Sequence, residues 1–465
     1  MISSSAKAAI TCLFLLLQTS AFPQKVSERL AAAFKAFQAD PQLRNGMASF
    51  YVLDASTGQV VYEQNGSVGL APASTVKVIT SATAYELLGK NFRYETSFAI
   101  RKGGEGAALV LVPSGDPTLG SWRWSHTKEE AVLTKIAAAM QATGVKVFNE
   151  VLVANDGWNE ETIPDGWIWQ DVGNYYGAGA AKLNWRENQF DVVLRSGKQV
   201  GEAVSVVRTV PALHGYTLQS EVRAAAAGTG DKAYIYFPLQ AGAATIRGTI
   251  PVNQSAFTIS GAMPAPAQQL VGALAQKLQL QGVTMPARAT IAPTLMMQPA
   301  TLTTVHKVVS PPLDSLIYWF NRRSINLYGE ALLKTIVYKS TGSANPDQGL
   351  HLLRNFWKQR GIPETELNMV DGSGLSPLNR VTTHAQVKVL QYARKQPWFS
   401  GFYESLPSIN GLKMKSGTIR DVKAFCGYHK SKDGKEYIFA FLVNNYNGTQ
   451  ASITQKMYQV LNELK

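Results

Sequence analysis

The segment APASTVKVIT, residues 71–80, places a lysine three positions after a serine at the predicted start of a helix. Pro72 lies near the beginning, apolar residues continue at helical spacing, and Gly89 follows, which are ordinary start and stop signals. Positions i and i+3 share one face of a helix, so we expect the Lys77 amine beside the Ser74 hydroxyl. A nucleophile and its base need this geometry, although such a pair is more often a capping serine with a solvated lysine.

The composition describes a globular protein of several domains. The chain has 465 residues, of which 45% are hydrophobic and 17% are charged. Single domains usually contain about 100 to 200 residues, so two or three domains are expected.

The N-terminus has the features of a cleaved export signal. Lys7 precedes the apolar run AAITCLFLLL, and small residues follow at positions 19–21. The run is shorter than the roughly 20 apolar residues that span a bilayer as a helix. We therefore expect a signal peptide over residues 1–21, cleaved near Ala21, and an exported, periplasmic protein. The mature chain would keep only Cys426, which allows no internal disulfide.

The formal charge of +13 indicates anionic partners. The basic residues are spread along the chain without an arginine-rich arm, so nucleic acid is not expected as a partner. A wall polymer or a membrane face fits better, as a weak surface association. The six histidines show no ligand spacing, so neither a metal site nor a cofactor is expected.

The order of predicted elements indicates an α+β architecture with an insertion. Predicted helices and a hairpin precede residue 95, and consecutive strands followed by a helix close the chain. Residues 96–299 instead alternate short β-rich runs with glycine and proline. We expect residues 22–95 and 300–465 to form one domain, and the insertion to form two small β-rich units, one nested at about 190–285.

Three short motifs follow one another in settings that suit a common site. Ser74 and Lys77 open a helix, Ser324-Ile-Asn326 lies at a predicted break between helices, and Lys415-Ser-Gly-Thr418 ends a strand. Together they resemble the signature of the penicillin-recognising serine enzymes. The fold that this implies is the penicillin-binding and β-lactamase-like transpeptidase fold, an antiparallel sheet flanked by helices.

The resemblance is closer to one branch of these enzymes. Lys77 and Ser324 are 324 − 77 = 247 residues apart, a larger insertion than a compact β-lactamase needs. The chain is similar to the D-alanyl-D-alanine carboxypeptidases and endopeptidases of the class C low-molecular-mass penicillin-binding type. Three further stretches agree with that family, namely SGDPTL at 114–119, the segment 163–188 and DGSGLSPLNRVT at 371–382.

The resemblance implies a serine DD-peptidase acting on peptidoglycan stem peptides and acylated by β-lactams. Ser74 would be the nucleophile, Lys77 its base and Ser324 a proton relay, while Asn326 would donate to the substrate. Burial and a nearby cation such as Lys415 would have to lower the pKa of Lys77. The substrate carboxylate would be held by Lys415 together with Ser416, Gly417 and Thr418, the last giving an oxyanion amide beside that of Ser74.

Two positions depart from the usual motifs of the family. Ser416 stands where threonine is usual, which keeps the hydroxyl, and Ile325 stands where aspartate is frequent. Asp171 and Tyr176 match positions that in some relatives line a pocket for the amino group of a diamino acid. In the alternative interpretation, Asp171 is a turn residue and Tyr176 is a core residue.

Two other functions remain open from the sequence. A β-lactamase uses the same motifs but needs a water activator for fast deacylation. A wall-binding or β-lactam-sensing protein without catalysis would have no need of both lysines and both serines. The balance of carboxypeptidase and endopeptidase action and the formation of a homodimer also remain open.

Overall fold

A six-stranded antiparallel sheet joins the two ends of the chain in the computed structural model, which describes residues 25–103, 106–159, 161–237, 243–293 and 302–465. The expected signal peptide, residues 1–21, lies outside the described residues. The strand order is β17-β18-β19-β20-β1-β2, so that β1 from the N-terminal part pairs with β20 from the C-terminal part. These strands are β1 (Met47–Asp54), β2 (Val60–Gln64), β17 (Ser408–Ile409), β18 (Leu412–Ile419), β19 (Val422–Lys430) and β20 (Glu436–Asn444).

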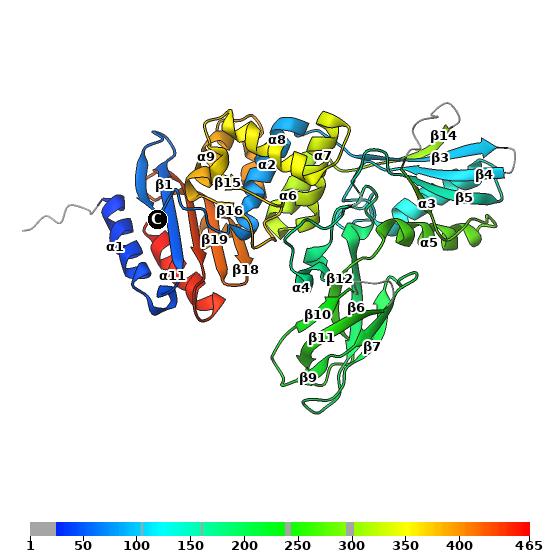
Figure 1. Cartoon of the computed structure of the whole chain (residues 1–465), viewed down its shortest axis with the longest axis horizontal. Helices are drawn as coiled ribbons and strands as arrows, with labels where there is room; N and C mark the ends of the chain where they lie inside the picture. Colours follow the sequence, from blue (N-terminus) through cyan, green and yellow to red (C-terminus); the bar gives the residue numbers. More distant parts are fainter. Residues whose placement is uncertain (1–24, 104–105, 160, 238–242, 294–301) are drawn as a thin grey trace, which may run out of the picture.

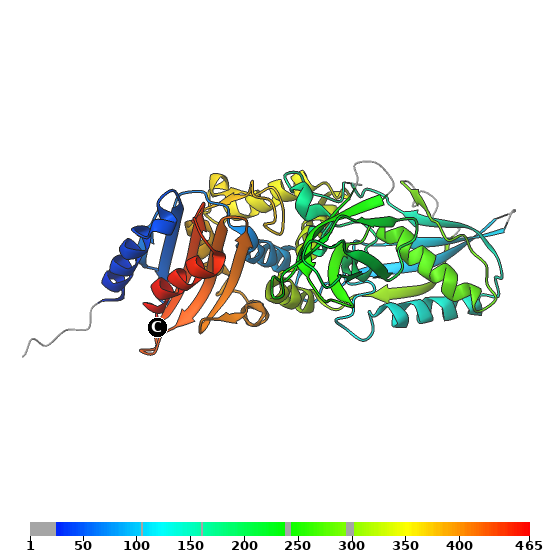
Figure 2. The same ribbon diagram turned by 90° about the horizontal axis from the view of Figure 1, so that it is seen from below.

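Two terminal helices cover one face of this sheet. Helices α1 (Val26–Gln38) and α11 (Gln450–Asn462) pack against each other there, as Figure 2 shows. Their apolar sides and the sheet bury a cluster of aromatic rings, among them Phe34, Phe50 and Phe441. The ring centroids of Phe50 and Phe441 are 4.7 Å apart. Burial of these rings fixes which face of each strand points to this side.

The second face of the sheet packs against a larger group of helices, which carries two of the three motifs (Figure 1). Helix α2 contacts α6, α7, α8 and α9. The helices are α2 (Lys77–Leu88), α6 (Leu313–Arg323), α7 (Asn326–Thr341), α8 (Pro346–Lys358), α9 (Thr383–Ala393) and α10 (Phe399–Ser405), and a two-stranded ribbon joins β15 (Leu367–Asn368) to β16 (Arg380–Val381). The sheet with helices on both faces is the expected α+β architecture.

A five-stranded sheet lies at the far end of the molecule in Figure 1. Its order is β13-β5-β4-β3-β14, formed by β3 (Glu95–Gly103), β4 (Gly106–Val112), β5 (Phe148–Ala154), β13 (Thr290–Ala292) and β14 (Leu302–Val309). Strand β14 lies after residue 299, where the insertion was expected to end, but it pairs with β3 at the start of the insertion. The sheet of the insertion therefore extends to Val309.

Two smaller sheets fill the middle of the insertion. One has the order β12-β6-β7, and the other has β10-β11-β8 with β9 paired to β11. The strands are β6 (Gln189–Arg195), β7 (Ser205–Val210), β8 (Thr217–Ser220), β9 (Arg223–Ala225), β10 (Lys232–Tyr236), β11 (Ala243–Pro251) and β12 (Phe257–Ala262). Helix α5 (Pro266–Gln279) falls within the range expected for the nested unit but packs against α3 (Glu129–Ala142), beside the five-stranded sheet.

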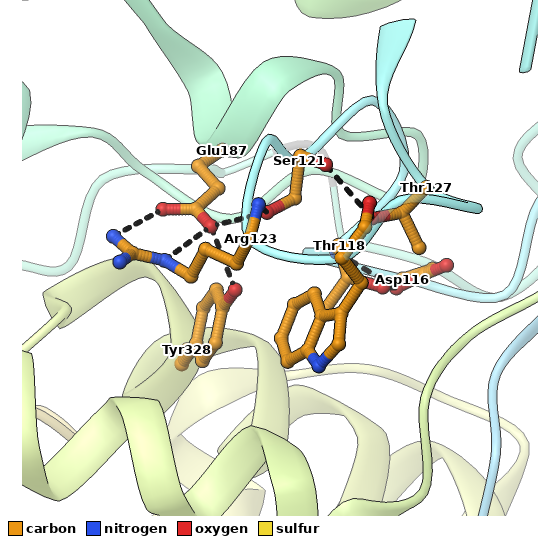
Figure 3. Close-up of polar contacts among 8 residues, drawn as sticks. Asp116, Thr118, Ser121, Arg123, Thr127, Glu187 and Tyr328 are labelled. Atoms are coloured by element: carbon orange, nitrogen blue, oxygen red, sulfur yellow. Dashed lines mark hydrogen bonds and ion pairs between the residues drawn. The ribbon is translucent and has the colours of Figure 1, made fainter. Parts of the chain in front are cut away.

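The buried carboxylate of Glu187 pairs with Arg123 inside the insertion and also accepts a hydrogen bond from α7 (Figure 3). The Glu187 carboxylate accepts hydrogen bonds from Arg123 Nε at 2.7 Å and from Ser121 Oγ at 2.6 Å. It also accepts one from the Tyr328 hydroxyl of α7 at 2.8 Å. Glu187 is fully buried and has φ +52°, within a left-handed turn of three residues. Such a backbone is costly, and it persists here because the contacts around it determine it.

Candidate active site

Ser74 lies in a short 3₁₀ turn, Ala73–Val76, that leads directly into α2. The sequence placed it in the first turn of the α-helix itself, whereas the α-helix begins at Lys77, after the 3₁₀ turn. In a 3₁₀ turn residues i and i+3 eclipse each other, which brings the two side chains close. Lys77 Nζ is 3.0 Å from Ser74 Oγ. The structure therefore forms the expected pair.

Two glycines let other segments approach this turn closely. Gly374 has φ +82°, and a Cβ there would lie 1.9 Å from the carbonyl oxygen of Ala73. A Cβ on Gly417 would lie 2.6 Å from the carbonyl oxygen of Pro72 and 3.0 Å from the Ser74 nitrogen. Ala73 itself has φ +46°. The backbone at the serine is thus held in a strained conformation by the packing of both segments.

The Lys77 amine has three polar neighbours. Besides Ser74 Oγ it contacts Asn326 Oδ1 at 2.7 Å and the Ser373 carbonyl oxygen at 2.6 Å. An amide oxygen and a backbone carbonyl can only accept hydrogen bonds, so each takes one N–H from the lysine. A neutral amine has only two N–H groups, and both are then used. Its lone pair is left to face the third neighbour, Ser74 Oγ. The contacts are those of a base that faces its nucleophile.

The environment of Lys77 favours the neutral amine. Lys77 is fully buried, and this desolvation lowers its pKa well below the usual value, with the charge of Lys415 acting in the same direction. The carboxyl groups of Asp371 and Glu330 oppose the shift. Burial outweighs them because an ammonium loses its hydration.

The second motif lies at the junction of α6 and α7. Ser324 ends α6 in the left-handed conformation, φ +56° and ψ +42°, and Asn326 begins α7. Asn326 Nδ2 donates to the carbonyl oxygen of Tyr176 at 2.7 Å, which turns Oδ1 toward Lys77. Ile325 is buried, 8% exposed, among the apolar helices.

Lys415 brings the third motif to the same place. Its Nζ donates to Ser324 Oγ at 3.0 Å and to the Ser416 carbonyl oxygen at 2.8 Å. The pKa of Lys415 is lowered to about 7, mainly by burial, and the charge of Lys423 acts in the same direction. In the part of the chain that the structure describes, β17 pairs with Leu412 and Lys413 of β18, and no strand pairs with residues 415–419 on that side. Such an edge can pair with an extended peptide.

The remaining motif residues follow Lys415 along β18. Ser416 and Thr418 are two positions apart and so share one face of the strand, while Gly417 packs against the Ser74 turn. Thr418 is exposed, and its Oγ1 accepts a hydrogen bond from Lys423 Nζ at 2.9 Å.

Asp171 and Tyr176 are connected to the second motif through Asn326. Tyr176 is bonded through its carbonyl oxygen to Asn326, and its hydroxyl group pairs with the Asp171 carboxylate. Burial raises the pKa of Asp171, and the hydrogen bond to Tyr176 partly offsets the shift. Asp171 is the penultimate residue of the short helix α4 (Trp169–Val172).

A buried carboxyl pair behind Lys77 was not anticipated from the sequence. Asp371 accepts from the backbone N–H groups of Gly374 and Ser376 at 2.7 and 2.6 Å, and from the Trp167 indole at 3.0 Å. Burial, and then the charge of Asp371, raise the pKa of Glu330 to about 8. The sequence signal at this place was the stretch DGSGLSPLNRVT at 371–382, which begins with Asp371.

Among the described residues, no cluster of three or more histidine, cysteine, aspartate or glutamate side chains is arranged to hold a metal ion. None of the described helices has the length and apolarity needed to cross a membrane.

Comparison with known proteins identifies the family of this chain. The sequence profile of the D-Ala-D-Ala carboxypeptidase 3 (S13) family matches residues 30–411. The chain belongs to this family. The match confirms the resemblance that the three motifs indicated and the expected enzyme class, a serine hydrolase of the D-Ala-D-Ala carboxypeptidase type.

Individual relatives cover most of the chain. A D-alanyl-D-alanine carboxypeptidase of Actinomadura sp. strain R39 is 27% identical, over 88% of this chain and 80% of its own length. The D-alanyl-D-alanine carboxypeptidase DacB of Haemophilus influenzae is 22% identical, over 86% of this chain and 85% of its own. The crystal structure of penicillin-binding protein 4 from H. influenzae superposes with a TM-score of 0.76 at 20% identity, covering 93% of this chain and 99% of that one. This likeness confirms the expected fold.

Proposed function

We propose that this protein hydrolyses the D-Ala-D-Ala bond of peptidoglycan stem peptides through an acyl-enzyme on Ser74, and that it also cleaves D-Ala cross-links. The observation that carries the proposal is the environment of Lys77. Its amine is fully buried, bonded to two obligate acceptors and directed at Ser74 Oγ. A structural lysine would gain nothing from losing its charge in this way.

Acylation begins when Ser74 Oγ attacks the carbonyl carbon of the penultimate D-Ala and its proton passes to Lys77 Nζ. The backbone N–H groups of Ser74 and Thr418 take the developing oxyanion, as the resemblance implies. The C–N bond then breaks, and the leaving amine takes a proton. Ser324 Oγ, which accepts a hydrogen bond from Lys415 at 3.0 Å, would relay that proton from Lys77.

Deacylation reverses these roles. A water molecule gives its proton to Lys77 while its oxygen attacks the ester carbon, and the bond to Ser74 Oγ breaks as the serine regains a proton. β-Lactams would acylate Ser74 in the same way, because their strained amide presents the same carbonyl beside a carboxylate.

The substrate would extend along the free edge of β18. Its terminal carboxylate would lie against Lys415, Ser416 and Thr418, and Asn326 would donate to its backbone. Asp171 with Tyr176 would receive the amino group of a diamino acid at the third stem position, because a half-buried carboxylate favours a cation.

We further propose that the protein is exported after cleavage near Ala21, and that residues 96–309 form the insertion in the catalytic domain. The formal charge of +13 supports an association with an anionic wall.

The test is the mass of the intact protein after exposure to benzylpenicillin, in parallel with release of D-alanine from a pentapeptide and separation of a cross-linked dimer into its two peptides. We expect one adduct on the wild type, none on Ser74→Ala, and strongly slowed formation on Lys77→Ala. The ratio of the cleavage rates of the two substrates measures carboxypeptidase against endopeptidase action. An adduct that persists on Ser74→Ala would refute the assignment of the nucleophile. Rapid loss of the wild-type adduct would instead indicate a β-lactamase.

The amino-group pocket has its own test. Asp171→Asn should lower kcat/KM by about tenfold to a hundredfold for a peptide whose third residue carries a free side-chain amine. The same peptide acetylated at that amine should be cleaved equally by both proteins. An equal loss on both peptides would mean that Asp171 only supports the local fold.

A further inference from the structure

Lys423 is a buried cation that the proposed mechanism does not use. It lies on β19, is 7% exposed, and pairs in register with Thr418 of β18. Among the described residues no carboxylate lies within ion-pair distance of its ammonium group. Burial is accordingly the cause of its shifted pKa, which is lowered to about 8. A buried ammonium without a counter-ion is unfavourable unless something else supplies the negative charge.

The hydrogen bond from Lys423 fixes the role of the Thr418 hydroxyl. An ammonium group can only donate, so at 2.9 Å Thr418 Oγ1 is the acceptor. The hydroxyl hydrogen of Thr418 is then free to point to another partner. A hydroxyl that accepts from a cation is also a stronger donor, because the two bonds polarise each other.

Thr418 lies on the part of β18 along which the substrate is proposed to bind. Thr418 is exposed, and it belongs to residues 415–419 of β18, which have no strand on their outer side. Lys415, at the other end of this stretch, donates to Ser324. Lys415 and Lys423 are close enough for the charge of one to lower the pKa of the other. The free edge is thus bordered by two buried lysines.

We infer that Lys423 completes a carboxylate subsite, in which it turns the Thr418 hydroxyl toward the ligand and supplies a second positive charge. The ligand class is a peptide C-terminal carboxylate or its equivalent in a β-lactam. The inference rests on the proposed function, because it assigns the carboxylate to this edge of β18. Lys423 is a positioning residue, and its effect should appear only with ligands that carry the carboxylate.

Acylation by benzylpenicillin and by its methyl ester distinguishes this role from a structural one. We expect Lys423→Met to slow acylation by the acid about tenfold to a hundredfold, the range of a hydrogen bond to a charged group. Acylation by the ester should change less than about twofold, which also shows that the variant is folded. Lys423→Arg should restore most of the rate with the acid. The control is Lys430→Met, at an exposed position on the same strand. Equal slowing of acid and ester, or no slowing of either, would overturn the inference.

A binding experiment separates failure of this inference from failure of the proposed function. An acetylated peptide ending in D-Ala-D-Ala and its C-terminal amide are titrated by NMR into the Ser74→Ala and Ser74→Ala/Lys423→Met proteins. The acid should bind more tightly than the amide only when Lys423 is present. This result without any acylation of the wild type would refute the enzyme mechanism and support the subsite. Acylation with no dependence on Lys423 in either experiment would refute the subsite alone.

Discussion

Asn326 of α7 and Tyr176 of the insertion are 150 residues apart and are joined by a 2.7 Å hydrogen bond from the side-chain amide to the backbone carbonyl. The bond requires Nδ2 to face the carbonyl, so Oδ1 must face Lys77. The insertion therefore sets the orientation of a group in the active site. Its segment around Tyr176 is part of the site as well as part of the added domain.

Asn326→Asp should raise the pKa of Lys77 and slow acylation. The substitution keeps the shape but places a negative charge where Oδ1 now lies 2.7 Å from the amine, and that charge favours the ammonium form. It also removes the donor to Tyr176. We expect the acylation rate at pH 7 to fall about a hundredfold or more and its rise with pH to move to higher pH. The measurement is the pH dependence of benzylpenicillin acylation.

The control is Asn355→Asp, at an exposed position on α8, which should change the rate less than about twofold. An unchanged pH profile in Asn326→Asp would show that Lys77 is not the group whose deprotonation limits the rate.

The rate of acylation should also decline at high pH, because Lys415 loses its charge. Burial lowers the pKa of Lys415 to about 7, so the cation is present below this pH and is lost as the pH rises through it. In Lys415→Arg the guanidinium stays charged over the whole range. The falling limb of the profile should therefore move to higher pH, even where the maximal rate is lower. If the limb stays in place, another group, such as Lys423, controls it.

Gly374→Ala should both destabilise the protein and slow acylation. The left-handed conformation alone costs an alanine roughly 1 to 2 kcal/mol, and its Cβ would also lie 1.9 Å from the Ala73 carbonyl oxygen. We expect a total loss of about 3 kcal/mol or more. Gly361→Ala is the matched control, because its φ is +84° and no atom lies within 4 Å of the added Cβ. Thermal unfolding and acylation rates of the two variants separate the cost of backbone strain from that of the clash with Ala73. Equal losses of stability and of acylation rate in both variants would show that Gly374 does not support the serine turn.

Much of the site was predictable because its residues lie at the ends of secondary-structure elements. Pro72 and the apolar spacing that follows mark the start of the helix at Ser74, and the break at Ser324 separates two helical stretches. The strand that carries Lys415 pairs with the following strand, β19, in a regular antiparallel register. Local signals of this kind depend on residue type and spacing, which the sequence contains.

The parts that could not be predicted depend on contacts between distant segments. The carbonyl of Tyr176 contributes a backbone atom, which no residue type signals. Lys423 sits in the string VKAFC, where a lysine has no distinguishing pattern until its strand is paired with β18. The pairing of β14 with β3 joins segments about 200 residues apart, so the border expected at residue 300 came too early.

The last prediction concerns the contact that fixes the insertion to α7. Glu187→Gln removes the charge that the buried Glu187 shares with Arg123, while keeping the size of the side chain. Breaking one partner of a buried ion pair usually costs about 3 kcal/mol, whereas Tyr328→Phe removes one hydrogen bond and should cost about 1 kcal/mol. Glu221→Gln is the control, since its ion pair with Arg247 is exposed and should contribute less than about 1 kcal/mol.

Calorimetry and limited proteolysis should distinguish the two ion pairs. In Glu187→Gln we expect a lower unfolding temperature and faster cleavage in the insertion, because the ion pair with Arg123 that holds this buried segment against Tyr328 is lost. We also expect slower acylation, since Tyr328 lies two residues after Asn326 on α7 and any movement of the insertion shifts the carbonyl of Tyr176. If stability falls while acylation is unchanged, the ionic contact stabilises the insertion without orienting Asn326, and the hydrogen bond to Tyr176 must be maintained by other contacts of the insertion.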